Sequence, residues 1–183
     1  MKKVFFLGDS IRLHYQELVQ EQLKDRAQFF WSPDNGRFTS YTMRYLDQWA
    51  ALCPDADIVH WNNGHWDADH MYGDEDSLVS FDEYKRNLSH LEGYIRKLFP
   101  KARIIFALTT PVDDGHPRVF NSEIERNNEA ARAILEPRGV IINDLYSVIK
   151  SNMQYIGPDK THMLDEGCQA LAKQVSRTIE ALL

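Results

Sequence analysis

Short apolar runs that alternate with amphipathic stretches constrain the fold of this chain more than any other feature of its sequence. Five runs have the length and composition of strands: Lys3–Leu7, Ala27–Trp31, Asp57–Trp61, Arg103–Leu108 and Val140–Asn143. Their apolar residues are consecutive rather than alternating, which is typical of parallel strands covered on both faces. We therefore expect a parallel sheet with helices on each side.

Helical patterns fill the segments between these runs. They cover His14–Asp25, Ser40–Leu52, Phe81–Phe99, Ser122–Leu135, Asp144–Asn152 and Asp165–Leu183. Regular alternation of strands and helices predicts the α/β class, as a three-layer α/β/α sandwich. Right-handed crossovers and five strands favour a flavodoxin-like sheet in the order 2-1-3-4-5.

Length and charge limit the number of domains and the kinds of partner. With 183 residues and no internal repeat or linker, residues 1–183 are predicted to form a single domain. The formal net charge of -6 argues against binding to nucleic acid or to an anionic membrane. No apolar run approaches the roughly 18 residues of a membrane span. The oligomeric state is not predicted by these features.

The beginning of the chain and its cysteines bear on the compartment. Lys2 and Lys3 precede a short apolar run, but Asp9 ends that run, whereas a secretory signal needs about 7–15 apolar residues. Cys53 and Cys168 are the only cysteines, and we expect them to be free thiols in a reducing environment. Together these features predict a cytoplasmic protein.

The residues that follow the first strand carry the first candidate group. Ligands of such sheets bind at the carboxyl ends of the strands, beside the switch between the first and third strands. Ser10 follows Gly8 and Asp9 at this place, so its hydroxyl is expected above the sheet. The alternative is that Asp9 or Ser10 only caps the next helix. Arg12 replaces the second glycine of a G-x-S-x-G elbow, which excludes that motif.

A hydroxyl nucleophile needs an oriented base, and Asp159 with His162 offers one. Residues three apart share a face of a helical turn, so the carboxylate can hold the imidazole in one tautomer. The alternative is a surface turn that begins at Pro158-Asp159.

Donors for a developing oxyanion are available after three of the strands. The N–H groups of Ser10 and Gly36 are two of them, and the side chain of Asn62 or Asn63 is the third. Either asparagine can instead serve only the turn that leads into Gly64.

Taken in order, these motifs resemble the SGNH (GDSL-like) hydrolase superfamily over essentially the whole chain. The resemblance implies a flavodoxin-like sandwich and hydrolysis of a small-molecule ester by serine, without a metal or cofactor. It implies that Ser10 is the nucleophile, His162 the base and Asp159 the residue that orients the base. It also implies an oxyanion hole made by Ser10 N–H, Gly36 and an asparagine.

The third motif departs from the family's usual G-x-N-D. Aligned on Gly64, it places Trp66 where the asparagine belongs. Some similar sequences carry H-x-N-x-G-x-x-D instead, which this chain matches with His60, Asn62, Gly64 and Asp67. We therefore predict Asn62 as the donor, with Asn63 as the alternative.

Other residues near this edge are candidates for further contacts. For the substrate pocket the candidates are Asp9, Trp61, Trp66 and Asp67, and the segments Asp67–Ser80 and Asp113–Asn121 are expected to shape it. A second cluster has the residue types of a metal site, namely His65, Asp67, Asp69 and His70. A solvated loop has the same composition, and we predict no metal.

These observations favour a serine esterase or acylhydrolase that acts through an acyl-enzyme on a small or carbohydrate-linked ester. Two alternatives remain: a flavodoxin-like module that binds a ligand, and a degenerate family member without hydrolase activity.

Overall fold

The computed structural model describes all 183 residues and contains one sheet. Its five strands are parallel and lie in the order β2-β1-β3-β4-β5, which confirms the predicted topology. The strands are β1 (Lys2–Leu7), β2 (Ala27–Trp31), β3 (Ile58–Trp61), β4 (Arg103–Ala107) and β5 (Ile141–Asn143). The switch between β1 and β3 therefore lies near the middle of the sheet.

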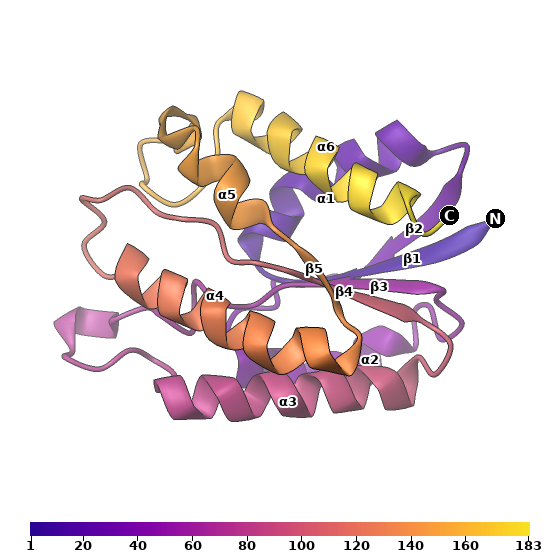
Figure 1. Cartoon of the computed structure of the whole chain (residues 1–183), viewed down its shortest axis with the longest axis horizontal. Coiled ribbons are helices and arrows are strands. Elements are labelled where there is room, and N and C mark those ends of the chain that lie inside the picture. Colours follow the sequence, from indigo (N-terminus) through magenta and orange to yellow (C-terminus); the bar gives the residue numbers. More distant parts are fainter.

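Helices cover both faces of this sheet (Figure 1). One face carries α1 (Ser10–Leu23), α5 (Leu145–Lys150) and α6 (Asp165–Glu180). The other carries α2 (Thr39–Ala50), α3 (Phe81–Leu98) and α4 (Asn121–Leu135). Short 3-10 turns lie at Met71–Gly73, Glu136–Arg138 and Met153–Tyr155. The arrangement is the three-layer sandwich that the sequence predicts.

Each strand supplies side chains to two separate cores. In β1, Val4 and Phe6 pack toward α1 and α6, whereas Phe5 and Leu7 pack toward α2, α3 and α4. All four are fully buried. Because successive side chains of a strand point to opposite faces, burial on both faces requires an unbroken apolar run. This explains the consecutive apolar residues of the sequence.

Helix α1 begins four residues earlier than its sequence pattern predicts. The pattern places its start at His14, but the helix starts at Ser10. Asp9 is its N-cap, since the Asp9 Oδ1 accepts the N–H of Ile11 at 3.0 Å. Such a cap satisfies a donor that the first helical turn leaves free. Ser10 is therefore the first residue of the helix.

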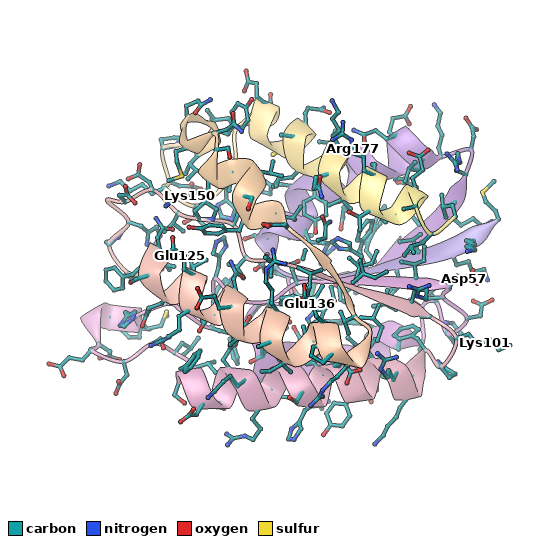
Figure 2. The ribbon with its side chains drawn as sticks, in the orientation of Figure 1. Asp57, Lys101, Glu125, Glu136, Lys150 and Arg177 are labelled. Carbon is teal, nitrogen blue, oxygen red and sulfur yellow. The ribbon has the colours of Figure 1, made fainter.

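The loops that follow the strands gather at the carboxyl edge, on the left of Figure 1. The segment 67–80 projects furthest in this view. Charged side chains lie on the outer helices, as Figure 2 shows for Glu125, Lys150 and Arg177. Lys150 Nζ lies 3.7 Å from Glu125 Oε1 and so links α5 to α4. None of the helices combines the length and apolar character that crossing a bilayer requires.

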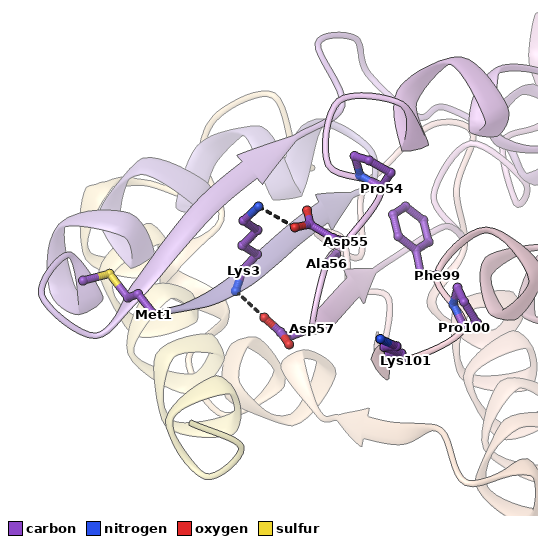
Figure 3. Close-up of a pocket in the computed structure, with 9 residues that line it drawn as sticks. All are labelled: Met1, Lys3, Pro54, Asp55, Ala56, Asp57, Phe99, Pro100 and Lys101. Atoms are coloured by element: carbon purple, nitrogen blue, oxygen red, sulfur yellow. Dashed lines mark hydrogen bonds and ion pairs between the residues drawn. The ribbon is translucent and has the colours of Figure 1, made fainter.

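A hollow of about 450 Å³ lies at the opposite edge, where the strands begin (Figure 3). The charged groups drawn there are largely paired with one another. Lys3 Nζ donates to Asp55 Oδ2 at 2.6 Å, and the Lys3 N–H donates to Asp57 Oδ2 at 2.8 Å. These groups are paired with one another, and Ser10 and His162 lie at the other edge.

Candidate active site

The turn between β1 and α1 fixes the position of Ser10. Gly8 has a φ of +154°, and a Cβ built on it would lie 1.9 Å from Asn62 Oδ1. Only glycine allows so close an approach of these two segments. Asp9 then caps the helix, which leaves the N–H of Ser10 without an acceptor inside α1. The serine thus combines a hydroxyl and a free N–H at the edge of the sheet.

Ser10, His162 and Asp159 form a continuous chain of hydrogen bonds. The Ser10 Oγ lies 2.7 Å from His162 Nε2, and the His162 Nδ1 lies 2.7 Å from Asp159 Oδ2. Because a carboxylate only accepts hydrogen bonds, Nδ1 carries the proton. Nε2 is then left to accept the hydroxyl proton of Ser10. This is the tautomer that a general base requires.

Asp159 is itself held in place by the main chain. Its Oδ1 accepts the N–H of Thr161 at 3.0 Å and that of His162 at 2.9 Å. Burial raises the pKa of Asp159, but these two N–H groups and the His162 ring outweigh it and lower the pKa to about 2. The carboxylate is therefore ionised throughout the range in which histidines titrate.

A closed loop carries both of these residues. The N–H of Gly157 donates to the His162 carbonyl at 2.7 Å, and the N–H of Lys160 donates to the Gly157 carbonyl at 2.9 Å. Lys160 adopts a left-handed conformation with a φ of +68°. An isolated bridge between Ile156 and Met163 closes the loop just before α6. The surface turn that is the alternative interpretation of this segment is present, and it also presents the imidazole to Ser10.

The two asparagines after β3 have different environments. Asn63 Nδ2 donates to the Arg37 carbonyl at 2.8 Å and to Thr42 Oγ1 at 3.0 Å, and its Oδ1 accepts from Trp61 Nε1 at 2.7 Å. The Asn62 side chain makes no hydrogen bond to the protein, and its Oδ1 lies against Gly8. Asn63 is thus committed to the turn, whereas the amide of Asn62 is not bonded to another group and lies beside Gly8, two residues before Ser10.

Gly36 differs from the prediction that its N–H is free. This N–H donates to the Gly8 carbonyl at 2.8 Å. A Cβ on Gly36 would lie 2.9 Å from the same oxygen, so the close approach requires glycine. In this structure the contact joins the loop after β2 to the turn after β1. The donors that remain at this edge are the Ser10 N–H and the amide of Asn62, which lies against Gly8.

Arg12 has a role in the site that its place in the sequence does not indicate, and its side chain is fully buried. Its guanidinium donates to the Gly8 carbonyl at 3.1 Å, to Ser32 Oγ at 2.9 Å and to the Asp34 carbonyl at 2.8 Å. Burial lowers the pKa of Arg12 to about 10. The residue braces the turn that carries Ser10 against the loop after β2.

Comparisons with known proteins address the fold. No protein-family model matches the chain, and no curated protein matches its sequence. Among solved structures, a lipase/acylhydrolase from Enterococcus faecalis has a TM-score of 0.85 at 18% identity, over 100% of this chain and 97% of that one. The acetyl xylan esterase AlAXEase has a TM-score of 0.80 at 17% identity, over 97% of this chain and 99% of that one. A member of the lipolytic protein G-D-S-L family from Veillonella parvula has a TM-score of 0.77 at 15% identity, over 98% of this chain and 99% of that one.

This chain has the fold of the SGNH, or GDSL-like, hydrolases. The resemblance that the motifs predict is thereby confirmed for the fold. Identities between 15% and 18% support a shared fold alone.

Within this SGNH fold the predicted pocket residues are either buried or partly exposed. Trp61 is fully buried and packs edge-on against Phe106, so the prediction that it lines a substrate pocket is wrong. Its side chain leaves the last residue of β3 toward the core rather than the edge. Asp9 and Asp67 are also buried. Of the four candidates only Trp66 keeps part of its surface exposed.

Asp67 caps α2 from a distant loop. Its Oδ1 accepts the Thr39 N–H at 3.0 Å and the Thr39 hydroxyl at 2.6 Å. Its Oδ2 is buried without a partner. Burial raises the pKa of Asp67 to about 7, although both contacts with Thr39 act to lower it. The residue therefore serves the start of α2.

The four residues with the composition of a metal site are held by separate partners. His65 Nε2 lies 2.7 Å from the Thr110 carbonyl. Asp69 pairs with Arg118 at 3.2 Å, and His70 Nε2 lies 2.7 Å from Glu123 Oε2. No group of three or more His, Cys, Asp or Glu side chains is arranged to hold a metal ion. Each of these side chains is thus held in a separate contact.

Proposed function

We propose that this protein is a serine esterase that works through an acyl-enzyme on Ser10. The observation that carries the proposal is the chain of two 2.7 Å contacts from Ser10 through His162 to Asp159. A hydroxyl, a neutral imidazole and a carboxylate in this order are the parts of nucleophilic acyl transfer.

In the first half-reaction the Ser10 Oγ attacks the carbonyl carbon of the ester while His162 Nε2 takes the hydroxyl proton. The C–O bond to the alcohol then breaks, and the imidazolium returns the proton to the leaving oxygen. The acyl group is now an ester of Ser10. In the second half-reaction His162 Nε2 takes a proton from water while the water oxygen attacks the acyl carbon. The bond from that carbon to Ser10 Oγ then breaks, the imidazolium returns the proton to Ser10 Oγ, and the acid is released.

The oxyanion that forms in both steps needs nearby donors. We assign this role to the Ser10 N–H and the Asn62 amide, since neither is bonded to another group of the protein. Gly36 joins them if its N–H turns from the Gly8 carbonyl, to which it now donates at 2.8 Å. Each such donor is worth about 10²–10³ in kcat.

The substrate class that we propose is a small or carbohydrate-linked ester, with acetyl esters as the first to test. Support comes from the acetyl xylan esterase among the structures with this fold. In the proposed reaction His162 accepts and returns each proton, so no step requires a metal.

Hydrolysis of p-nitrophenyl acetate, p-nitrophenyl octanoate and acetylated xylan by the wild type and by Ser10→Ala tests the proposal. We expect acetyl release by the wild type only, unchanged by EDTA. Loss of activity on chelation, with recovery on adding zinc or manganese, would instead indicate a metal hydrolase. Absence of hydrolysis with all three substrates would favour a binding module.

A further inference from the structure

A second histidine lies against the base. The rings of His14 and His162 are stacked, with centroids 4.8 Å apart and planes inclined by 19°. His14 belongs to α1 and follows Ser10 by four residues. Residues four apart lie on one face of a helix. One face of α1 therefore contacts His162 at two places. The Ser10 hydroxyl contacts the Nε2 atom of His162, and the His14 ring stacks on the face of the His162 ring.

We propose that His14 is a positioning residue that holds the His162 ring in the plane that directs Nε2 at Ser10. The inference rests on the proposed esterase function, because it concerns the base of that reaction. It adds a residue that the motifs do not include.

His162 needs this second restraint because its hydrogen bond to Asp159 is open to water. The side chains of His162 and Asp159 are 31% and 54% exposed. Ion pairs and hydrogen bonds at such exposure hold a geometry only weakly, since water competes for both partners. A hydrogen bond at Nδ1 also leaves the ring free to tilt about that contact. A flat group stacked on the ring restrains the tilt.

The surroundings of His14 favour the neutral form of its ring. Burial lowers the pKa of His14, and the neighbouring His162 lowers it further, while Asp159 acts to raise it. Cys168 Sγ of α6 lies 4.0 Å from His14 Nδ1. The groove of about 540 Å³ beside His14 also contains the carboxylates of Glu17 and Asp165.

A neutral ring at His14 covers the imidazolium that forms on His162 during the reaction. A protonated His14 would instead repel it. Because His14 also lines the groove, solvent protons reach it. The stack should therefore favour the reaction at neutral pH and oppose it in acid.

Two substitutions separate stacking from titration. His14→Phe keeps a flat ring without a charge, and His14→Ala removes the ring. We expect His14→Ala to lower kcat about tenfold with KM within about twofold, since misplacing a catalytic group costs turnover rather than binding. His14→Phe should retain kcat within about threefold at pH 7.5. Gln20→Ala, an exposed change further along α1, is the control, and its kinetics should equal the wild type's.

The acid side of the pH profile gives a readout that a merely structural role would not move. We expect protonation of either His14 or His162 to inactivate the enzyme. In a plot of log kcat/KM against pH, the acid limb of the wild type should then steepen from a slope of one toward a slope of two as pH falls. In His14→Phe the slope should stay at one. Equal slopes in the two proteins, or a His14→Ala variant with wild-type kcat, would overturn the proposal.

A measurement without substrate separates this inference from the proposed function. In the NMR spectrum, the ring C–H signals of His162 should move by several tenths of a ppm in His14→Ala, because the stacked ring is lost, and stay put in Gln20→Ala. If esterase activity is absent but these signals shift, the stacking of His14 on His162 is supported and the proposed function is contradicted. If activity is present and the signals do not shift, the proposed function is supported and the role of His14 is contradicted.

Discussion

Ser10 Oγ and His162 Nε2 lie 2.7 Å apart although 152 residues separate them in the chain. The helices that follow each of them explain this contact. α1 begins at Ser10 and α6 begins just after His162, and the two helices pack side by side on the same face of the sheet. Ile11 and Leu171 belong to the same core beneath them. The packing that stabilises the fold also brings the Ser10 hydroxyl to the His162 ring.

The first prediction concerns the base and its carboxylate. His162→Ala should lower kcat by about 10³-fold or more, because no other group can take the Ser10 proton. Asp159→Asn should cost about 10²–10³, since the tautomer of His162 is then no longer fixed. Steady-state kinetics from pH 5 to 9 check both variants.

The pH dependence has a defined sign in this experiment. The pKa of Asp159 is lowered to about 2, so the stabilisation that it gives is complete above its unfolded value and is lost only as pH falls toward 2. Between pH 5 and 9 Asp159 remains ionised, so the acid limb of the wild-type profile does not come from this carboxylate, and we assign it to histidine. A limb with its midpoint below pH 4 would contradict this assignment.

The second prediction separates the two asparagines. Asn62→Ala should lower kcat by about 10² or more with little change in melting temperature, because the protein makes no hydrogen bond to this side chain. Asn63→Ala removes three hydrogen bonds, so it should destabilise the fold by about 1–3 kcal/mol. At a temperature where it is folded, its kcat should fall by only a few fold.

Thermal melts and kinetics of the two variants side by side provide the comparison. A reversed pattern, with turnover lost in Asn63→Ala and stability lost in Asn62→Ala, would move the donor to Asn63. If neither variant changes kcat, the oxyanion hole does not include an asparagine.

The third prediction uses Asp67, a buried carboxyl group that serves α2. Its pKa is raised to about 7, so the folded protein holds a proton that the unfolded chain releases above pH 4. Stability should therefore fall as pH rises from about 4 to 7. Asp67→Asn keeps an oxygen for Thr39 but cannot ionise. Its melting temperature relative to the wild type should rise between pH 5 and pH 8, and a pH-independent difference would contradict this account.

The sequence predicts the fold almost completely because a run of consecutive apolar residues recurs in every strand. Runs buried on both faces, as in Val4–Leu7, leave short continuous apolar segments, and their alternation with helical patterns favours a parallel sheet. The spacing of Asp159 and His162 also predicts their contact, since a single turn determines it. Both are local features, which a sequence displays directly.

The remaining parts of the site depend on contacts between distant segments. Arg12 reads as a surface residue of a helix, yet its partners Ser32 and Asp34 lie in another loop. The packing of α1 against the loop before α6 sets the His14 stack, and no motif records it. Asn62 and Asn63 point in different directions, and only the approach to Gly8 shows which of them remains free.

The most direct test of the central claim is covalent labelling of the wild type by a fluorophosphonate, mapped by mass spectrometry of its peptides. The proposed mechanism predicts one label per chain on Ser10, absent from Ser10→Ala and formed at least 10²-fold more slowly in His162→Ala. Melting temperatures of both variants should match the wild type, which shows that the loss is chemical. A label on another serine, or labelling of Ser10→Ala at the wild-type rate, would contradict the assignment of Ser10 as the nucleophile.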